Sequence, residues 1–184
     1  MKTSTKKIHL ITLIITLFAI FLDQLSKWFV VQYLKPIRSF QLIEGVFSLR
    51  YLENSGAAFG ILYGRQFFLI TVSILVTLVM IYFYTRIPHT KRHLYIRIVA
   101  ILIVSGAIGN LIDRIRLGFV IDFLFFELIN FPIFNLADSF IVIGSILLFI
   151  LAIFYYKENE LEFLFVFSET KEEIVKDETR EEKE

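Results

Sequence analysis

Four long apolar segments constrain the fold of this chain more than any other feature. They cover approximately residues 8–31, 67–84, 94–112 and 133–156. A helix needs about 20 mostly apolar residues to cross a bilayer, and each segment meets or approaches that length. The chain is 57% hydrophobic and only 20% charged, whereas soluble domains are roughly 45–50% apolar and about 25% charged. We therefore predict an integral membrane protein with four transmembrane helices.

The first segment could alternatively be a cleaved signal peptide, because three lysines precede its apolar run. That run ends in Asp23-Gln-Leu-Ser-Lys27, and no small-x-small cleavage pattern follows it. We expect this segment to remain as the first membrane span.

The near-neutral net charge of +1 conceals two parts of opposite charge. Residues 1–157 carry 15 basic and 7 acidic side chains, whereas residues 158–184 carry 4 basic and 11 acidic ones. We predict a four-helix transmembrane domain over 1–157 and an acidic cytoplasmic tail over 158–184. The tail has too few apolar residues for a core, so we expect a solvated extension, with partner binding as the alternative.

Basic residues near the span ends predict the orientation in the membrane. Lys2, Lys6 and Lys7 precede the first span, and four more basic residues lie between 86 and 97. Both regions should be cytoplasmic. Both termini then lie inside, and the first and third links lie outside.

The first and third links contain β-strand patterns. Residues 39–42 and 47–51 alternate apolar and polar side chains on either side of Glu44-Gly45, which is typical of a hairpin. Residues 119–126 are also rich in β-formers. The expected fold class is an all-α integral membrane protein of four transmembrane helices with a small extracytoplasmic β-sheet.

Four aspartates of the predicted transmembrane domain lie at one predicted depth in the membrane. Asp23 is 15 residues past Ile8, or roughly 22 Å along a helix from its inner end. Asp113 closes the third span, Asp122 follows in the outer link, and Asp138 lies roughly 8 Å into the fourth span. Ionisable groups at the edge of the hydrocarbon are costly and indicate function.

A purely structural role is the alternative for each aspartate. Asp23 has Lys27 four residues later, the favourable order for a helical ion pair, and Asp113 adjoins Arg114. Asp122 and Asp138 have no basic neighbour in sequence, which favours a functional role for both.

Three amides are expected near these carboxylates. Asn135 is three residues before Asp138 and Asn110 three before Asp113, so each pair shares a helix face. Asn54 lies in a segment of small residues that permits close backbone approach. The amides could orient the carboxylates, or each could be a helix cap or turn residue.

The absence of cysteine and the positions of the histidines exclude several kinds of catalysis. The chain has no cysteine, and its three histidines all fall on the predicted inner side, which excludes thiol, Ser–His and histidine–zinc chemistry at the outer face. Two neighbouring carboxylates in a poorly solvated place share one proton. The ionised member can activate water while its protonated partner polarises a carbonyl, which is aspartyl peptide hydrolysis.

At these residues the chain resembles the lipoprotein signal peptidases (signal peptidase II), a family of bacterial aspartyl membrane proteases. The resemblance covers about residues 8–156 and excludes the acidic tail. Five motifs match in order: Asp23-Gln-Leu-Ser-Lys27, Asn54-Ser-Gly-Ala-Ala-Phe59, Gly109-Asn-Leu-Ile-Asp-Arg114, Val120-Ile-Asp-Phe123 and Phe134-Asn-Leu-Ala-Asp138.

The resemblance implies a catalytic dyad of Asp122 and Asp138. It also implies a short amphipathic helix near the first link. Independently of the resemblance, we expect Phe59 and nearby apolar residues of the first link to close over the site. The implied supporting residues are Asp23, Lys27, Asn54, Gly56, Phe59, Asn110, Asp113, Arg114 and Asn135.

The substrates implied by the resemblance are diacylglyceryl prolipoproteins in the bacterial cytoplasmic (inner) membrane, cleaved just before the lipidated cysteine. The resemblance further implies that the protein needs no metal or organic cofactor, is inhibited by globomycin and is a monomer. Membrane lipid is an expected partner and nucleic acid is not.

Two other functions are alternatives to the peptidase. A small proton-coupled transporter would use the carboxylates as a relay, and a scaffold subunit would need no unpaired aspartates. A relay should place acids at several depths, whereas the inner half of every predicted span lacks them. The sequence favours the peptidase.

Overall fold

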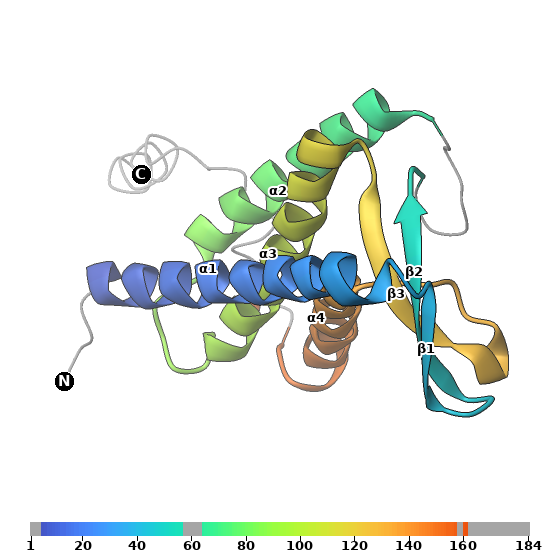
Figure 1. Cartoon of the computed structure of the whole chain (residues 1–184). Helices are drawn as coiled ribbons and strands as arrows, with labels where there is room; N and C mark the ends of the chain where they lie inside the picture. The colour runs from blue at the N-terminus through green and yellow to red at the C-terminus, as the bar shows by residue number, and fades with distance from the viewer. Residues whose placement is uncertain (1–4, 57–63, 158–159, 162–184) are drawn as a thin grey trace, which may run out of the picture.

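The computed structural model describes residues 5–56, 64–157 and 160–161. Within these ranges, four helices are long and apolar enough to cross a membrane. They are α1 (Thr5–Phe29), α2 (Gln66–Arg86), α3 (Leu94–Leu117) and α4 (Leu136–Phe154) (Figure 1). The π-helical segment η1 (Val30–Leu34) continues α1, burying Val30 and Leu34 and exposing Tyr33.

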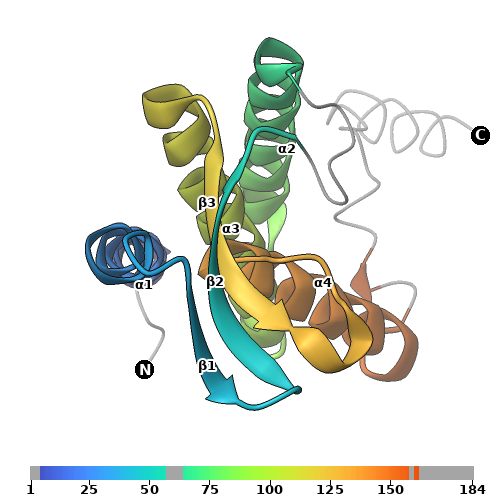
Figure 2. The ribbon, with the colours of Figure 1, turned by 45° about the vertical axis from the view of Figure 1, so that its right-hand side comes forward.

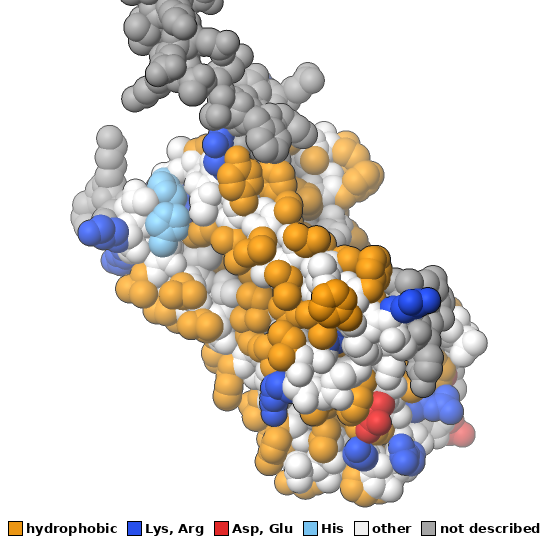
Figure 3. Space-filling view, turned by 90° about the horizontal axis from the view of Figure 1, so that it is seen from above, with side chains coloured by type: hydrophobic (Ala, Val, Ile, Leu, Met, Phe, Trp, Pro, Cys, Tyr) orange, Lys and Arg blue, Asp and Glu red, His pale blue; other side chains and the backbone are white. Residues whose placement is uncertain are grey.

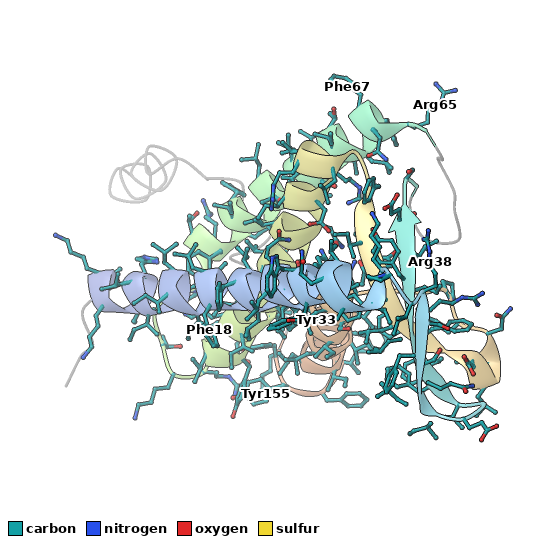
Figure 4. The ribbon with its side chains drawn as sticks, in the orientation of Figure 1. Phe18, Tyr33, Arg38, Arg65, Phe67 and Tyr155 are labelled. Atoms are coloured by element: carbon teal, nitrogen blue, oxygen red, sulfur yellow. The ribbon has the colours of Figure 1, made fainter. Side chains whose placement is uncertain are left out.

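Helix α3 is the centre of the bundle and packs against the other three helices. Half of the residues in its apolar 18-residue stretch are buried inside the protein. The corresponding share is 6% for the span that α1 begins, 11% for α2 and 17% for α4. The outer helices therefore direct most of their apolar side chains away from the protein. Phe18 of α1 and Phe67 at the start of α2 are examples (Figure 4). In Figure 3 such side chains cover the middle of the molecule, with lysine and arginine near its ends.

Helices α3 and α4 approach closely through glycines. A Cβ at Gly106 would meet the backbone carbonyl of Ala137 on α4, and a Cβ at Gly144 would lie 2.8 Å from the Ile103 side chain. Small residues that let backbones approach are the usual basis of helix packing in membranes. This contact fixes the start of α4 against α3.

A three-stranded antiparallel sheet stands at the end of α1 remote from the N-terminus (Figure 1). Its strands β1 (Ser39–Ile43), β2 (Phe47–Asn54) and β3 (Val120–Phe126) lie in that order, with β2 between the others (Figure 2). Gly45 has a φ of +69° in the β1–β2 turn, a conformation that glycine adopts without strain. The four predicted helices and the small sheet with its hairpin are confirmed, whereas the short amphipathic helix near the first link stays a prediction.

The sheet is anchored to the end of the first helix by a small core. Val30 and Leu34 of η1 pack against Tyr51 of β2 and against Ile121 and Phe123 of β3. This core holds β3, the strand that carries Asp122, against the helical bundle.

Two helix ends next to the sheet differ from the predicted spans. Helix α4 begins at Leu136 rather than at 133, because the backbone of Phe134 pairs with Leu124 of β3. Helix α3 continues to Leu117 instead of ending near 112, so Asp113 lies inside it, one turn before its end. Both differences arise where a strand and a helix meet.

Candidate active site

The carboxyl groups of Asp122 and Asp138 are connected through one asparagine. Asn135 Nδ2 donates to Asp122 Oδ1 at 2.7 Å, and the Asn135 backbone N–H donates to Asp138 Oδ2 at 3.2 Å. In return, the Asp138 N–H donates to Asn135 Oδ1 at 2.9 Å, which completes a capping box at the start of α4. The predicted helix-cap role and the predicted carboxylate contact are therefore both present at Asn135.

Two further amides hold the outer sides of the two carboxyl groups. Asn54 Nδ2 donates to Asp122 Oδ2 at 2.8 Å, and Asn110 Nδ2 donates to Asp138 Oδ1 at 2.7 Å. Asn135 Nδ2 also donates to Asn110 Oδ1 at 3.1 Å. Residues of β2, β3, α3 and the α4 cap thus form one network that fixes both carboxyl rotamers.

Lys27 is the centre of a second, fully buried cluster behind this network. Its Nζ lies 2.9 Å from Asp23 Oδ2, 2.9 Å from Asp113 Oδ2 and 3.0 Å from Asn110 Oδ1. The predicted Asp23–Lys27 ion pair is confirmed. Asp113, by contrast, pairs with Lys27 and not with its neighbour Arg114.

The two carboxylates of this cluster also accept backbone hydrogen bonds from the elements that carry the candidate dyad. Ala137 N–H donates to Asp23 Oδ1 at 2.9 Å, and Ile121 N–H donates to Asp113 Oδ2 at 3.2 Å. Asp122 and Asp138 each follow one of these residues. Asp23 and Asp113 thereby position the backbone next to the two candidate catalytic residues.

Gln24 belongs to the same cluster, although the sequence analysis did not select it. Its Nε2 donates to Asp23, to Asp113 and to the carbonyl of Gly109, at 3.0–3.1 Å. The sequence feature that could have identified Gln24 is its position inside the Asp23-to-Lys27 motif.

Burial and charge raise the pKa of Asp122 to about 7. Desolvation is the largest cause, and the nearby charge of Asp138 is the second. Hydrogen bonds from Asn54 and Asn135 and the charge of Lys27 act in the opposite direction. The carboxyl pair therefore retains a proton close to neutral pH.

A cavity of about 1060 Å³ opens beside the two aspartates. One part of its wall is polar and includes Asn54, Asn110, Arg114, Asp122 and Asp138. The rest is largely apolar and comes from α2, α4 and the segment after β3. Its apolar residues include Val72, Val76, Ile133, Ile141 and Val142.

The other predicted site residues fall into two groups. Arg114 lines the cavity and donates from Nη2 to the carbonyl of Gly56 at 3.5 Å, while the Gly56 N–H donates to Asn54 Oδ1 at 3.0 Å. Asp23, Lys27 and Asp113 do not line the cavity and belong instead to the buried cluster around Lys27. Phe59 lies outside the described residues, so its predicted cover role stays a prediction.

Glu53 also lines the cavity, although the sequence analysis did not select it. Hydrogen bonds from the Tyr51 hydroxyl and the Lys35 ammonium hold the pKa of Glu53 below its usual range. Glu53 is therefore ionised at neutral pH. Within the described part of the chain, no cluster of three or more His, Asp or Glu side chains could hold a metal ion, and the expectation of no cofactor stays a prediction.

Comparison with known proteins identifies the family. Residues 15–154 match the family described as Signal peptidase (SPase) II. The chain belongs to the signal peptidase II family. The lipoprotein signal peptidase of Caldanaerobacter subterraneus is 46% identical over 143 residues, covering 77% of this chain and 95% of that protein. That of Clostridioides difficile is 42% identical over 147 residues, covering 80% and 97%.

Solved structures agree with this assignment. A bacterial membrane enzyme determined by the in meso method at 2.3 Å resolution superposes with a TM-score of 0.70 and 31% identity, covering 87% of this chain and 94% of that one. A second, at 1.9 Å resolution, gives a TM-score of 0.67 and 32% identity, covering 79% and 94%. This signal peptidase II is a multi-pass membrane protease, and the transporter alternative has no support.

Proposed function

We propose that this signal peptidase II cleaves diacylglyceryl-modified prolipoproteins just before the lipidated cysteine, with Asp122 and Asp138 as its catalytic dyad. One observation carries the dyad assignment. Both carboxyl groups line one cavity, are bridged by Asn135, and retain a proton near neutral pH because the pKa of Asp122 is raised to about 7.

The shared proton gives each carboxyl group a role in hydrolysis. The ionised group takes a proton from a water molecule, whose oxygen attacks the scissile carbonyl carbon. The protonated group donates its proton to the carbonyl oxygen, which gives a neutral tetrahedral intermediate. On collapse, the carboxyl group that took the proton from water gives it to the leaving nitrogen, and the C–N bond breaks. The other carboxyl group takes a proton from a hydroxyl of the intermediate, which restores the shared proton. The amide donors of Asn54, Asn110 and Asn135 hold both carboxyl groups in place throughout.

The apolar wall of the cavity suits a lipid-modified substrate. Val72 and Val76 of α2 and Ile141 and Val142 of α4 supply a surface for acyl chains. The signal helix and the lipid could then enter from the bilayer while the scissile bond reaches the carboxyl groups. A monomer is sufficient for this arrangement, because one chain supplies both aspartates.

We place the site at the outer face of the bacterial cytoplasmic membrane, with both termini in the cytoplasm. The end of the molecule opposite the sheet carries Lys6, Lys7, Arg86, Lys91 and Arg92. An excess of lysine and arginine is typical of cytoplasmic loops. The sheet and the cavity then face outward.

The dyad is tested by incubating purified enzyme with a lipid-modified prolipoprotein. The cleavage rate is measured from the gel shift of the processed product. Asp122→Asn and Asp138→Asn should each lower the cleavage rate by at least about 10³-fold, because each removes one of two interdependent groups. Glu44→Gln, the same chemical change in the exposed β1–β2 turn, should leave the rate unchanged, and globomycin should inhibit the unchanged enzyme.

Two results would contradict the proposal. Full cleavage by either aspartate variant would remove that residue from the dyad. Failure of the unchanged enzyme on the lipidated substrate, or equal cleavage of the same protein without its diacylglyceryl group, would overturn the substrate assignment.

A further inference from the structure

A second, smaller groove lies between α1, α2 and α3, away from the proposed active site. Its volume is about 250 Å³ and its lining is almost entirely apolar. The lining residues from α1 are His9, Thr12, Leu13 and Thr16, which recur on one helix face. The residues from the other helices are Ile81, Tyr84, Ala100, Ile101, Val104 and Ile108.

At its end near the N-terminus of α1, the groove adjoins a group of polar side chains, of which His9 and Tyr84 line it. His9 Nδ1 and the Tyr84 hydroxyl form a hydrogen bond of 3.0 Å. The ring of His89 lies 4.9 Å from that of His9, edge to face. Arg97 Nη2 donates to His89 Nδ1 at 2.6 Å, and its guanidinium carbon lies 6.0 Å from the centre of the Tyr84 ring.

Arg97 is a buried cation whose described partners are all neutral. It is only 4% exposed, and its other hydrogen bonds go to the carbonyls of Ile87 and Pro88. Its Nη1 is buried without a hydrogen-bond partner among the described residues. A buried charge without an opposite charge is costly, so this position favours an anion.

The surroundings of the groove end are also positively charged. Lys6 lies one helical turn before His9, on the same side of α1. Lys91 and Arg92 follow in the loop between α2 and α3. The one acidic side chain described at this end of the bundle is Glu160, and it pairs with Arg92. The guanidinium carbon of Arg92 lies 4.6 Å from the centre of the Tyr155 ring.

We propose that this groove binds an anionic phospholipid of the cytoplasmic leaflet. One acyl chain lies along the apolar lining from Thr12 to Thr16, and the phosphate lies at the basic end near Lys6, His9 and Arg97. Charge complementarity selects this occupant, because the apolar lining suits an acyl chain and the unopposed cations suit a phosphate. The assignment to the cytoplasmic leaflet rests on the orientation proposed above.

The test is native mass spectrometry of the full chain in detergent micelles. Phosphatidylglycerol and phosphatidylcholine with the same acyl chains are added in separate titrations, and the bound fraction is measured. Phosphatidylglycerol should bind about fivefold or more tightly than phosphatidylcholine, with one molecule retained per chain. Glycerol 3-phosphate should not compete, because it lacks the acyl chain.

Three variants locate the site. Lys6→Gln should weaken phosphatidylglycerol binding about fivefold. Lys7→Gln removes the same charge on the opposite side of α1 and should leave the affinity unchanged. Thr12→Phe fills the groove without changing its charge and should abolish retention of the lipid.

Several outcomes would overturn the inference. These are equal binding of both lipids, equal loss in the two lysine variants, retention by Thr12→Phe, or a dimer in place of a lipid adduct. Prolipoprotein cleavage is measured on the same preparations. A protein that cleaves but does not retain the lipid contradicts only this inference, and one that retains the lipid but does not cleave contradicts only the proposed function.

Discussion

At the scale of single residues, burial decides what each charge contributes. Lys27 is 2% exposed and faces two carboxylates, whereas the Lys35–Glu53 pair has both side chains more than 40% exposed. Both lysines lie 2.9 Å from a carboxylate oxygen. Distance alone would rank them equally, but solvent screens the exposed pair and not the buried one.

Lys27→Met should therefore destabilise the enzyme by about 3–5 kcal/mol, because it leaves Asp23 and Asp113 as buried, uncompensated charges. Lys35→Met should cost far less, because solvent screens this exposed pair. Thermal unfolding of both variants in the same detergent checks the difference. Equal shifts in unfolding temperature would show that the buried cluster does not hold the fold together.

The cleavage rate should fall as pH rises above about 7. Asp122 is an acid whose pKa is raised from 3.8 to about 7, so it is protonated below this pH and ionised above it. Loss of that proton leaves both carboxyl groups ionised, without a donor for the carbonyl oxygen. The rate should then drop by about tenfold for each further pH unit.

Rate–pH profiles with lipidated substrate measure this effect. Glu53→Gln is the matched variant, because the pKa of Glu53 is already held below its usual range. It should leave the midpoint of the alkaline decline in place. A flat profile from pH 6 to 9 would be incompatible with a proton shared by the dyad.

At the scale of helices and strands, the site depends on how closely α3 and α4 pack. Gly106 meets the backbone of Ala137, the residue next to Asp138. Asn110, one turn after Gly106 on α3, donates to Asp138 at 2.7 Å. A small shift of α4 would break this hydrogen bond.

Gly106→Ala should thus cost about 1–3 kcal/mol of stability and should lower the cleavage rate about tenfold or more. Gly118→Ala is the control, because Gly118 has a φ of +78° at the end of α3 but open space around a new Cβ. It should cost about 1 kcal/mol with an unchanged rate. Retained activity in Gly106→Ala would show that the site tolerates a change in helix spacing.

At the scale of the whole molecule, polar and apolar surfaces alternate along the direction from the N-terminus of α1 to the sheet. The apolar outer faces of α1, α2 and α4 lie between two polar ends, one of which carries the sheet (Figures 1 and 3). This distribution is that of a membrane protein whose two ends face different compartments.

Single cysteines test the orientation without background labelling, because the natural chain contains none. Ser39→Cys at the exposed start of β1 should react with a membrane-impermeant maleimide added to intact cells or spheroplasts, and Thr90→Cys should react only after lysis. Ser48 is unsuitable because it is 1% exposed. The reverse labelling pattern would invert the proposed topology.

The sequence by itself determined the four apolar helices, the hairpin and the clustering of aspartates near one end. These features depend on hydrophobic length, alternation and spacing along the chain, which are local properties. The close agreement of the hairpin with residues 39–42 and 47–51 follows from the same local patterns.

Only the tertiary structure decided the partners of the polar side chains. Lys27 joins Asp113 across 86 residues, Asn135 both caps α4 and holds Asp122, and Phe134 pairs with β3 and delays the start of α4. Sequence spacing cannot specify such contacts, because a side chain's partner depends on how separate elements pack. The same limit explains why Gln24, Glu53 and the basic end of the second groove emerged only from the folded chain.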